Sequence, residues 1–275
     1  MLRLNGVAVD GAAAFDMSDR GLTLGDGLFE TIAVFSGRPA LLGAHLDRLE
    51  RSAAEIRLPV DRAFCEAEIL ALVAAVGSAD AVIRLTVTRG AGARGLALPD
   101  DAKPNIIAAA SPYPKGALNA PVRLATVSVR RNPTSFASRA KTLSYLDSVL
   151  AFDEAKRAGA DDALMLNTDG RVASTSMANI FALIGDELVT PPVSEGVLPG
   201  IVRCAVLELA AQAGLKAAER ALDIEAFDRA DAVFATNSVR QVMPVTMVDG
   251  LRRGTPDPVA RLAALVTRAC GARGA

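Results

Sequence analysis

Hydrophobic and polar positions follow two different periods along this chain. Short apolar or alternating runs, separated by turn pairs such as Asn5-Gly6 and Asp169-Gly170, predict β-hairpins. Between them, apolar residues at helical spacing predict helices, the first of which carries Leu46, Leu49, Ala53 and Ile56 on one face. Further helices are predicted at about residues 61–76, 143–158, 201–213 and 258–270. Hairpins outnumber β-α-β units, which indicates an α+β fold with largely antiparallel sheets.

A proline-rich stretch interrupts this pattern before the middle of the chain. Residues 111–121 hold three prolines and a glycine between two apolar strands. Such a segment is typical of a connection between domains. We therefore expect an N-terminal α+β domain over residues 1–112, a linker over 113–120 and a C-terminal domain over 121–275.

Composition excludes several classes of function. A net charge of -1 over 275 residues argues against binding to nucleic acid or to anionic membranes, and no apolar run approaches the ~20 residues of a membrane span. Cys65, Cys204 and Cys270 are odd in number and widely spaced, which predicts reduced, buried thiols in a cytoplasmic protein. The single histidine, His45, and these cysteines lack metal-ligand spacing, so we expect no metal.

Lys141 is the strongest candidate for chemistry, since only five lysines accompany twenty-five arginines. A lysine amine can lose its proton and attack a carbonyl, whereas a guanidinium cannot. Lys141 precedes a predicted helix, whose dipole would lower the pKa of the amine. A lysine on the surface of the first helical turn is the competing interpretation.

Three other features would suit a phosphorylated aldehyde. Gly200-Ile201-Val202 opens a predicted helix, where backbone amides can bind an anion. Thr236-Asn237-Ser238 ends a predicted strand and could donate to phosphate oxygens. Arg48 lies beside the apolar face of its helix. Each also has a purely structural interpretation: an ordinary helix start, an ordinary turn and a solvated arginine, respectively.

The order of motifs along the chain adds a resemblance to a known family. The run from Ser18 to Thr31, SDRGLTLGDGLFET, resembles the N-terminal signature of class IV aminotransferases, which are fold-type IV pyridoxal-phosphate enzymes. Further matches follow in the family's order at His45–Leu49, Thr88–Gly90, the Lys141 segment, Val172–Phe181, Leu198–Arg203 and Val242–Val245. The family includes D-amino-acid transaminases, branched-chain aminotransferases and aminodeoxychorismate lyases.

The resemblance implies a homodimer of two-domain subunits, with pyridoxal 5′-phosphate between the domains and an amino-acid-like small molecule as substrate. Lys141 would form the Schiff base with the cofactor and move the substrate's Cα proton. The remaining roles are also implied by the family. Phosphate would bind Arg48, Gly200, the amides of Ile201 and Val202, Asn237 and Ser238; Tyr145 would reach the phenolic oxygen; Phe29 and Arg94 would contact substrate.

One position departs from the family pattern. Ser174 stands where most members carry a glutamate that bonds the protonated pyridine nitrogen of the cofactor. A hydroxyl supplies no negative charge to hold that proton, so the ring would be a weaker electron sink. An elimination, in which a leaving group removes the electrons, would tolerate this. Alternatively, Glu195 or another carboxylate takes the role, or the protein is a catalytically impaired paralogue.

Loop sequences favour the lyase branch of the family. The glycine-rich loop from Arg89 to Leu96 is similar to that of aminodeoxychorismate lyases, whereas D-amino-acid transaminases carry a histidine where this chain has Leu96. Arg131-Asn132-Pro133 is also lyase-like. We therefore expect a 4-amino-4-deoxychorismate lyase, with a D-amino-acid or branched-chain transaminase as the alternative.

Overall fold

The computed structural model describes residues 1–272, which divide into two compact units. Unit 1 comprises Met1–Pro114 and Ala140–Ser144, and unit 2 comprises Lys115–Arg139 and the described chain from Tyr145 onward. The first crossing between units therefore falls inside the linker proposed at residues 113–120. The Lys141 segment, however, belongs to unit 1, whereas the sequence prediction assigned it to the C-terminal domain.

Unit 1 is built on a six-stranded sheet in which every neighbouring pair is antiparallel, in the order β2-β1-β6-β5-β3-β4. The predicted hairpin at Asn5-Gly6 forms, and both turn residues have positive φ. The strands are β1 (Leu2–Leu4), β2 (Val7–Val9), β3 (Gly27–Phe35), β4 (Arg38–Pro39), β5 (Ala81–Thr88) and β6 (Asn105–Pro112).

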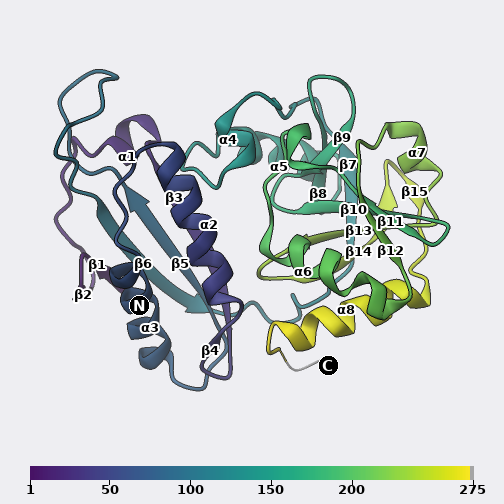
Figure 1. Cartoon of the computed structure of the whole chain (residues 1–275), viewed down its shortest axis with the longest axis horizontal. Coiled ribbons are helices and arrows are strands. Elements are labelled where there is room, and N and C mark those ends of the chain that lie inside the picture. Colours follow the sequence, from purple (N-terminus) through teal and green to yellow (C-terminus); the bar gives the residue numbers. More distant parts are fainter. Residues whose placement is uncertain (273–275) are drawn as a thin grey trace. The chain divides into compact units, whose positions relative to one another are not determined.

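Helices α2 (Leu42–Glu55) and α3 (Arg62–Val76) cover the same face of this sheet (Figure 1). A shorter helix, α1 (Arg20–Leu24), precedes β3. The predicted apolar stripe of α2 is buried at Leu46, Leu49 and Ala53, whereas Ile56 follows the last helical residue and is half-buried. Helix α3 begins after Asp61, whose side chain accepts from the Phe64 amide. Burying this face removes apolar surface from water and fixes α2 against β3.

Unit 2 is built on a nine-stranded sheet ordered β12-β11-β10-β13-β14-β7-β8-β9, with β15 paired to β14. An additional pairing of β9 with β10 closes the strands from β10 to β9 into a ring. The strands are β7 (Val122–Thr126), β8 (Asp162–Leu166), β9 (Val172–Thr175), β10 (Asn179–Ile184), β11 (Glu187–Thr190), β12 (Lys216–Glu219), β13 (Ala232–Asn237), β14 (Gln241–Val248) and β15 (Leu251–Arg252).

Most strand pairs in unit 2 are antiparallel, as predicted, but β7 runs parallel to both β14 and β8, and β12 runs parallel to β11. Phe181 and Phe234 stack in its core with ring centroids 4.9 Å apart. The helices are α4 (Phe136–Arg139), α5 (Leu146–Arg157), α6 (Ile201–Leu209), α7 (Ile224–Asp228) and α8 (Asp257–Ala269), with 3-10 turns at Val193–Glu195 and Ala210–Ala213.

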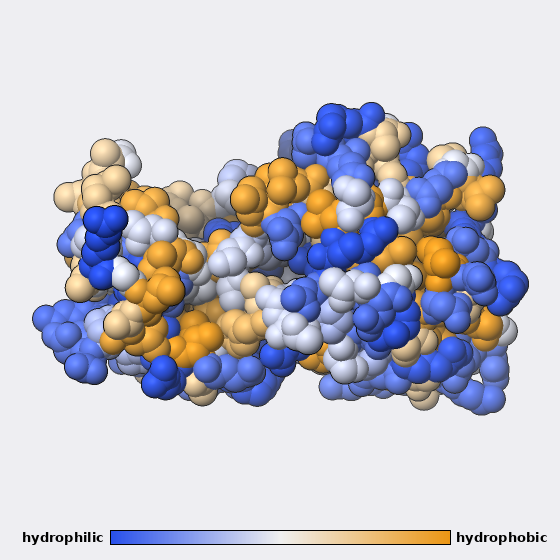
Figure 2. Space-filling model, turned by 90° about the horizontal axis from the view of Figure 1, so that it is seen from above, coloured by the Kyte–Doolittle hydropathy of each residue, from blue (hydrophilic) through white to orange (hydrophobic). Residues whose placement is uncertain are grey.

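The surface carries both polar and apolar side chains. Figure 2 shows orange apolar patches among blue hydrophilic residues on the face that it draws. Exposed apolar residues include Leu146, Val149 and Leu150 of α5. Cys65 and Cys270 are buried as predicted, but Cys204 is exposed, because it lies on the outer side of α6. Within residues 1–272, no helix has the length and apolar character that crossing a membrane requires.

Candidate functional site

Lys141 is held by strand pairing with β3 in unit 1. The Phe29 amide donates to the Lys141 carbonyl at 2.9 Å, and the Leu143 amide donates to the Gly27 carbonyl at 3.0 Å. Thr142 forms a bridge with Leu28. The prediction that Lys141 begins a helix was therefore wrong, since α5 starts only at Leu146.

The amine of Lys141 lies in an environment that favours its neutral form. Its Nζ atom is 4.1 Å from the centre of the Phe29 ring, and the Arg84 guanidinium lies 3.7 Å from the same ring. Burial lowers the pKa of Lys141 to about 7, helped by the positive charges of Arg48 and Arg84 and opposed by Glu30. A large fraction of the amine is thus unprotonated near neutral pH, as a nucleophile requires.

A buried ion-pair cluster adjoins this lysine. Glu30, on β3, accepts from Arg48 Nε at 2.8 Å and from Arg48 Nη2 at 2.6 Å. His45 Nδ1, one helical turn before Arg48, lies 2.7 Å from Glu30 Oε2. The pKa of Glu30 falls to about 2, because the charge of Arg48 and the bonds from both partners outweigh burial. Burial lowers the pKa of His45, so this ring is neutral at pH 7.

Arg48 and Phe29 lie close to Lys141, whereas Arg94 belongs to an exposed loop. Arg48 is buried in α2 rather than solvated, with its guanidinium fixed by Glu30. Arg94 is exposed in the loop that follows β5. Arg20 supports that loop, since its Nη1 donates to the carbonyls of Gly95 and Ala97.

In unit 2, three polar residues form a row across adjacent strands. Ser174 on β9 pairs with Asn179 on β10, and Asn179 pairs with Thr236 on β13. Directly paired residues of antiparallel strands present their side chains on the same face of a sheet. Ser174, Asn179 and Thr236 therefore share one face, and all are nearly fully buried.

The N-terminus of α6 adjoins this row. Asn179 Nδ2 donates to the Leu198 carbonyl at 2.8 Å, and a Cβ atom at Gly200 would lie 2.0 Å from Asn179 Oδ1. Gly200 is the N-cap residue and provides no side-chain cap, so the amides of Ile201 and Val202 are not capped by a side chain. A helix start of this kind can bind an anion.

The turn after β13 follows directly from a strand against which α6 packs. Asn237 Oδ1 accepts from the amides of Val239 and Arg240, so its carbonyl oxygen stabilises its own turn. Ser238 is half-buried in the same turn. Two neighbours are buried without a hydrogen-bond partner among the described residues: the Thr236 hydroxyl and the Gln241 amide.

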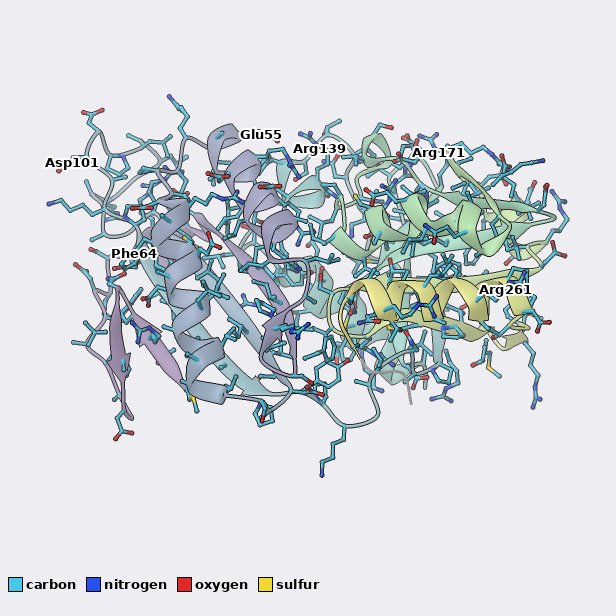
Figure 3. All side chains as sticks on the ribbon, turned by 60° about the horizontal axis from the view of Figure 1, so that its bottom comes forward. Glu55, Phe64, Asp101, Arg139, Arg171 and Arg261 are labelled. Atoms are coloured by element: carbon cyan, nitrogen blue, oxygen red, sulfur yellow. The ribbon has the colours of Figure 1, made fainter. Side chains whose placement is uncertain are left out.

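Ser174 is bonded to an arginine rather than to a carboxylate. Arg131 Nε donates to Ser174 Oγ at 3.2 Å, and Ser174 Oγ donates to the Thr175 carbonyl at 2.9 Å. Glu195, the alternative carboxylate, instead accepts from Asn167 and from Arg171, the latter labelled in Figure 3. Tyr145, the residue before α5, interacts electrostatically with Arg131.

Each unit, taken by itself, holds groups that suit a phosphorylated aldehyde such as pyridoxal phosphate. Unit 1 offers a partly deprotonated lysine amine beside a fixed arginine. Unit 2 offers an uncapped helix start, a glycine with no room for a side chain, and buried hydroxyl and amide groups that have no partner within residues 1–272. Unpartnered buried polar atoms are rare in folded proteins and often mark a ligand site.

Two residues of these clusters were missed by the sequence prediction. Glu30 stands inside the N-terminal signature, and its spacing from Arg48 gave no indication of the ion pair because they lie on different elements. Arg131 was noted only as part of a lyase-like motif. The serine at position 174 could have indicated Arg131, because the loss of the family's carboxylate changes which charged side chains can lie next to this position.

Comparisons with known proteins agree with these features. A family model described as amino-transferase class IV matches residues 27–248. The chain is 38% identical over 251 residues to a putative branched-chain-amino-acid aminotransferase of Methanocaldococcus jannaschii, covering 90% of this chain and 87% of the relative.

Solved structures extend the likeness to the fold. The 4-amino-4-deoxychorismate lyase of Pseudomonas aeruginosa superposes with a TM-score of 0.88 at 34% identity, covering 98% of both chains. The pyridoxal-phosphate-bound form of a hypothetical aminotransferase from Mycobacterium tuberculosis gives 0.88 at 26% identity, again over 98% of each. The chain therefore belongs to the class IV aminotransferase family and is a pyridoxal-phosphate-dependent enzyme with the type IV fold.

Proposed function

We propose that this enzyme is a 4-amino-4-deoxychorismate lyase, which releases pyruvate and 4-aminobenzoate. The observation that carries the proposal is the absence of negative charge at Ser174, whose oxygen is bonded to Arg131. The likeness to the Pseudomonas aeruginosa lyase over 98% of both chains supports it. We also propose that the enzyme works as a homodimer, as the family resemblance implies, and that it is cytoplasmic, as its odd and widely spaced cysteines predict.

Bound pyridoxal phosphate supplies an aldehyde for an amine and a ring that withdraws electrons from the substrate's Cα. Lys141 Nζ is the amine that would bond this aldehyde and later carry the Cα proton, for which its pKa of about 7 is suited. In unit 1, Arg48 would hold the phosphate, oriented by Glu30.

In unit 2, the amides of Ile201 and Val202 would donate to phosphate oxygens, and Gly200 lets the chain approach closely. Asn237 and Ser238 would add further donors from the turn after β13. Arg94 would bind a substrate carboxylate and Phe29 would contact the substrate. Tyr145 would reach the phenolic oxygen of the cofactor.

The lack of a negative charge at Ser174 bears on the type of reaction. A carboxylate beside the ring nitrogen would hold a proton there and strengthen the electron sink. Ser174 gives no such charge, so electrons from Cα are held less strongly. Loss of a leaving group during the reaction relieves this demand, which favours elimination over amino-group transfer.

An amino-acid transaminase of D-amino-acid or branched-chain type is the second candidate. It is favoured by the 38% identity to the putative branched-chain aminotransferase over 90% of this chain. A cofactor-binding protein with impaired catalysis is a third, minor possibility that the same experiment separates.

Single-turnover assays on the cofactor-loaded enzyme distinguish these functions. We expect aminodeoxychorismate to give pyruvate and 4-aminobenzoate, while D-alanine and L-leucine convert little of the cofactor to its amine form. Rapid conversion by either amino acid without pyruvate release from aminodeoxychorismate would establish a transaminase instead. Absence of both reactions in a protein that binds the cofactor would indicate the impaired form.

A further inference from the structure

Arg131 occupies an unusual place for an arginine that makes no ion pair with any carboxylate in the described part of the chain. Its backbone is fixed at the end of β8, because its amide donates to the Leu166 carbonyl at 2.9 Å and its carbonyl accepts from the Thr168 amide at 3.0 Å. The neighbouring Arg130, by contrast, is exposed. The side chain of Arg131 therefore starts from a backbone anchored beside the end of β8 and reaches Ser174 on β9.

The guanidinium of Arg131 is bonded entirely to uncharged oxygens among the described residues. Nε donates to Ser174 Oγ at 3.2 Å, and Nη2 donates to Ser148 Oγ at 3.1 Å. Nη2 also lies 3.3 Å from the carbonyl oxygens of Thr175 and Ser176. The positive charge is therefore held next to Ser174 without being neutralised by an ion pair in the part of the chain that the structure describes.

Ser174 offers a neighbouring group one remaining oxygen lone pair and no negative charge that could hold a proton there. Its hydroxyl hydrogen is directed at the Thr175 carbonyl, and one of its lone pairs accepts from Arg131. A positively charged ring nitrogen placed beside Ser174 Oγ would lie near the guanidinium of Arg131, which bonds the same oxygen. Like charges at such separations disfavour the protonated form.

The other charged and titratable groups around Arg131 are Tyr145, Asp147 and Asp162. Asp162 Oδ1 accepts from the Ser176 hydroxyl and from the amides of Ser176 and Ala163, and burial raises its pKa. Its bonds are thus directed at neighbouring loop and strand groups. Asp147 is exposed on the first turn of α5. None of these carboxylates bonds Ser174.

We propose that Arg131, acting through Ser174, is the positioning residue that keeps the ring nitrogen of bound pyridoxal phosphate unprotonated. The proposal rests on the proposed placement of that nitrogen at Ser174. Arg131 reverses the sign of the charge that the family's glutamate would supply. The cofactor is then a weaker electron sink, and the enzyme is restricted to substrates whose Cα electrons can leave with a departing group.

The protonation state can be measured directly on the cofactor. Enzyme loaded with pyridoxal phosphate carrying ¹⁵N in its ring would be followed by NMR, since the nitrogen resonance of a neutral pyridine differs strongly from that of a pyridinium. We expect the neutral signal in the wild-type holoenzyme from pH 6 to 8. In Arg131→Gln, we expect the protonation midpoint to rise by about one pH unit or more.

Two matched variants separate charge from structure. Arg130→Gln removes the same charge from the adjacent, exposed position and should leave the midpoint unchanged, whereas Arg131→Lys keeps a cation and should retain the neutral signal. A pyridinium signal in the wild-type holoenzyme overturns the proposal, and so does an equal midpoint in Arg131→Gln and wild type. If Arg131→Gln does not fold, the wild-type and Arg131→Lys spectra still decide.

A second measurement on the same holoenzyme separates failure of the proposed function from failure of the proposed role of Arg131. Borohydride reduction followed by peptide mass analysis reports whether the cofactor is attached to Lys141. Attachment with a pyridinium signal contradicts only the role of Arg131. Absence of attachment contradicts the placement of the cofactor, and with it the proposed function.

Discussion

Glu30 and Arg48 form a buried, two-point ion pair beside the candidate nucleophile. Both side chains are nearly fully buried, and two separate nitrogen–oxygen contacts, of 2.8 and 2.6 Å, join them. The pair connects β3, which also aligns Lys141, with α2, which carries His45. One carboxylate thereby fixes the arginine and moderates the charge around the amine.

Replacing Glu30 with glutamine should destabilise the protein and weaken cofactor binding. The substitution preserves shape but removes the negative charge opposite Arg48, and breaking a buried ion pair in this way costs on the order of 3–5 kcal/mol. Urea unfolding measures the first effect, and titration with pyridoxal phosphate measures the second. The double variant Glu30→Gln, Arg48→Met should recover stability but not cofactor affinity. Full affinity in the double variant would exclude Arg48 from phosphate binding.

The same cluster should make stability fall with acidification in two ranges. The ordinary pKa of histidine is 6.5 and that of His45 is lower, so below pH 6.5 the unfolded chain takes up a proton that the folded chain does not. For Glu30, the pKa falls from 4.5 to about 2, so its contribution is complete above 4.5 and is lost as pH falls towards 2.

The contribution of Glu30 to the free energy of unfolding that is lost between pH 4.5 and pH 2 should be on the order of 3 kcal/mol, from the size of its pKa change. Unfolding free energies measured from pH 8 to pH 3 check both ranges. Glu30→Gln should flatten the lower range relative to wild type, and His45→Asn should flatten the upper one. An unchanged slope below pH 4.5 in Glu30→Gln would assign the acid sensitivity to other carboxylates.

Lys141 should react with the cofactor more readily as pH rises through about 7, because only the neutral amine attacks an aldehyde. The rate of cofactor attachment to the cofactor-free enzyme, followed at roughly 400–430 nm where bound cofactor absorbs, gives this profile. Lys141→Ala should abolish the band. Lys156→Ala, which alters an exposed lysine, should leave it intact. A band that persists without Lys141 would move the nucleophile elsewhere.

Sequence alone identified Lys141 but not the reason for its reactivity. The scarcity of lysines and the order of motifs selected this residue, and both are properties of the linear chain. Its pKa depends on burial and on Arg48, which is brought to it by the pairing of residues 141–143 with β3, more than a hundred positions earlier. A pairing of that range has no local signal, and a helix start was predicted in its place.

Secondary structure could be predicted from the sequence where residues within one turn determine it. Asp61 and Gly77 bound α3 closely, because a side-chain cap and a positive-φ glycine act within one turn of a helix end. The parallel placement of β7 beside β14 and β8 was not predicted, since it joins segments that no turn connects. The role of Arg131 was not recognised for a similar reason: its partner Ser174, on β9, is 43 positions later in the chain.

Gly200→Ala should weaken cofactor binding more than it weakens the fold. The added Cβ would meet Asn179 Oδ1 at 2.0 Å, so either the helix start or the amide side chain must move. The helix start belongs to the proposed phosphate site, and Asn179 is hydrogen-bonded next to it, to the Leu198 carbonyl. Gly254→Ala is a matched control, because a Cβ there meets nothing within 4 Å. We expect a clear rise in the cofactor dissociation constant for Gly200→Ala only. Equal affinity in both variants would exclude the α6 start from phosphate binding.

Ser174→Glu should shift the enzyme from elimination towards amino-group transfer. The new carboxylate would lie within reach of Arg131, whose Nε already donates to the serine oxygen at 3.2 Å, and would offset the guanidinium charge. A negative charge at this position favours a protonated ring nitrogen and a stronger electron sink. The measurement is the ratio of cofactor conversion by D-alanine or L-leucine to pyruvate release from aminodeoxychorismate. Ser174→Gln, of similar size but uncharged, controls for bulk. If the ratio rises equally in both variants, space rather than charge limits the transfer reaction, and the electrostatic argument for the lyase fails.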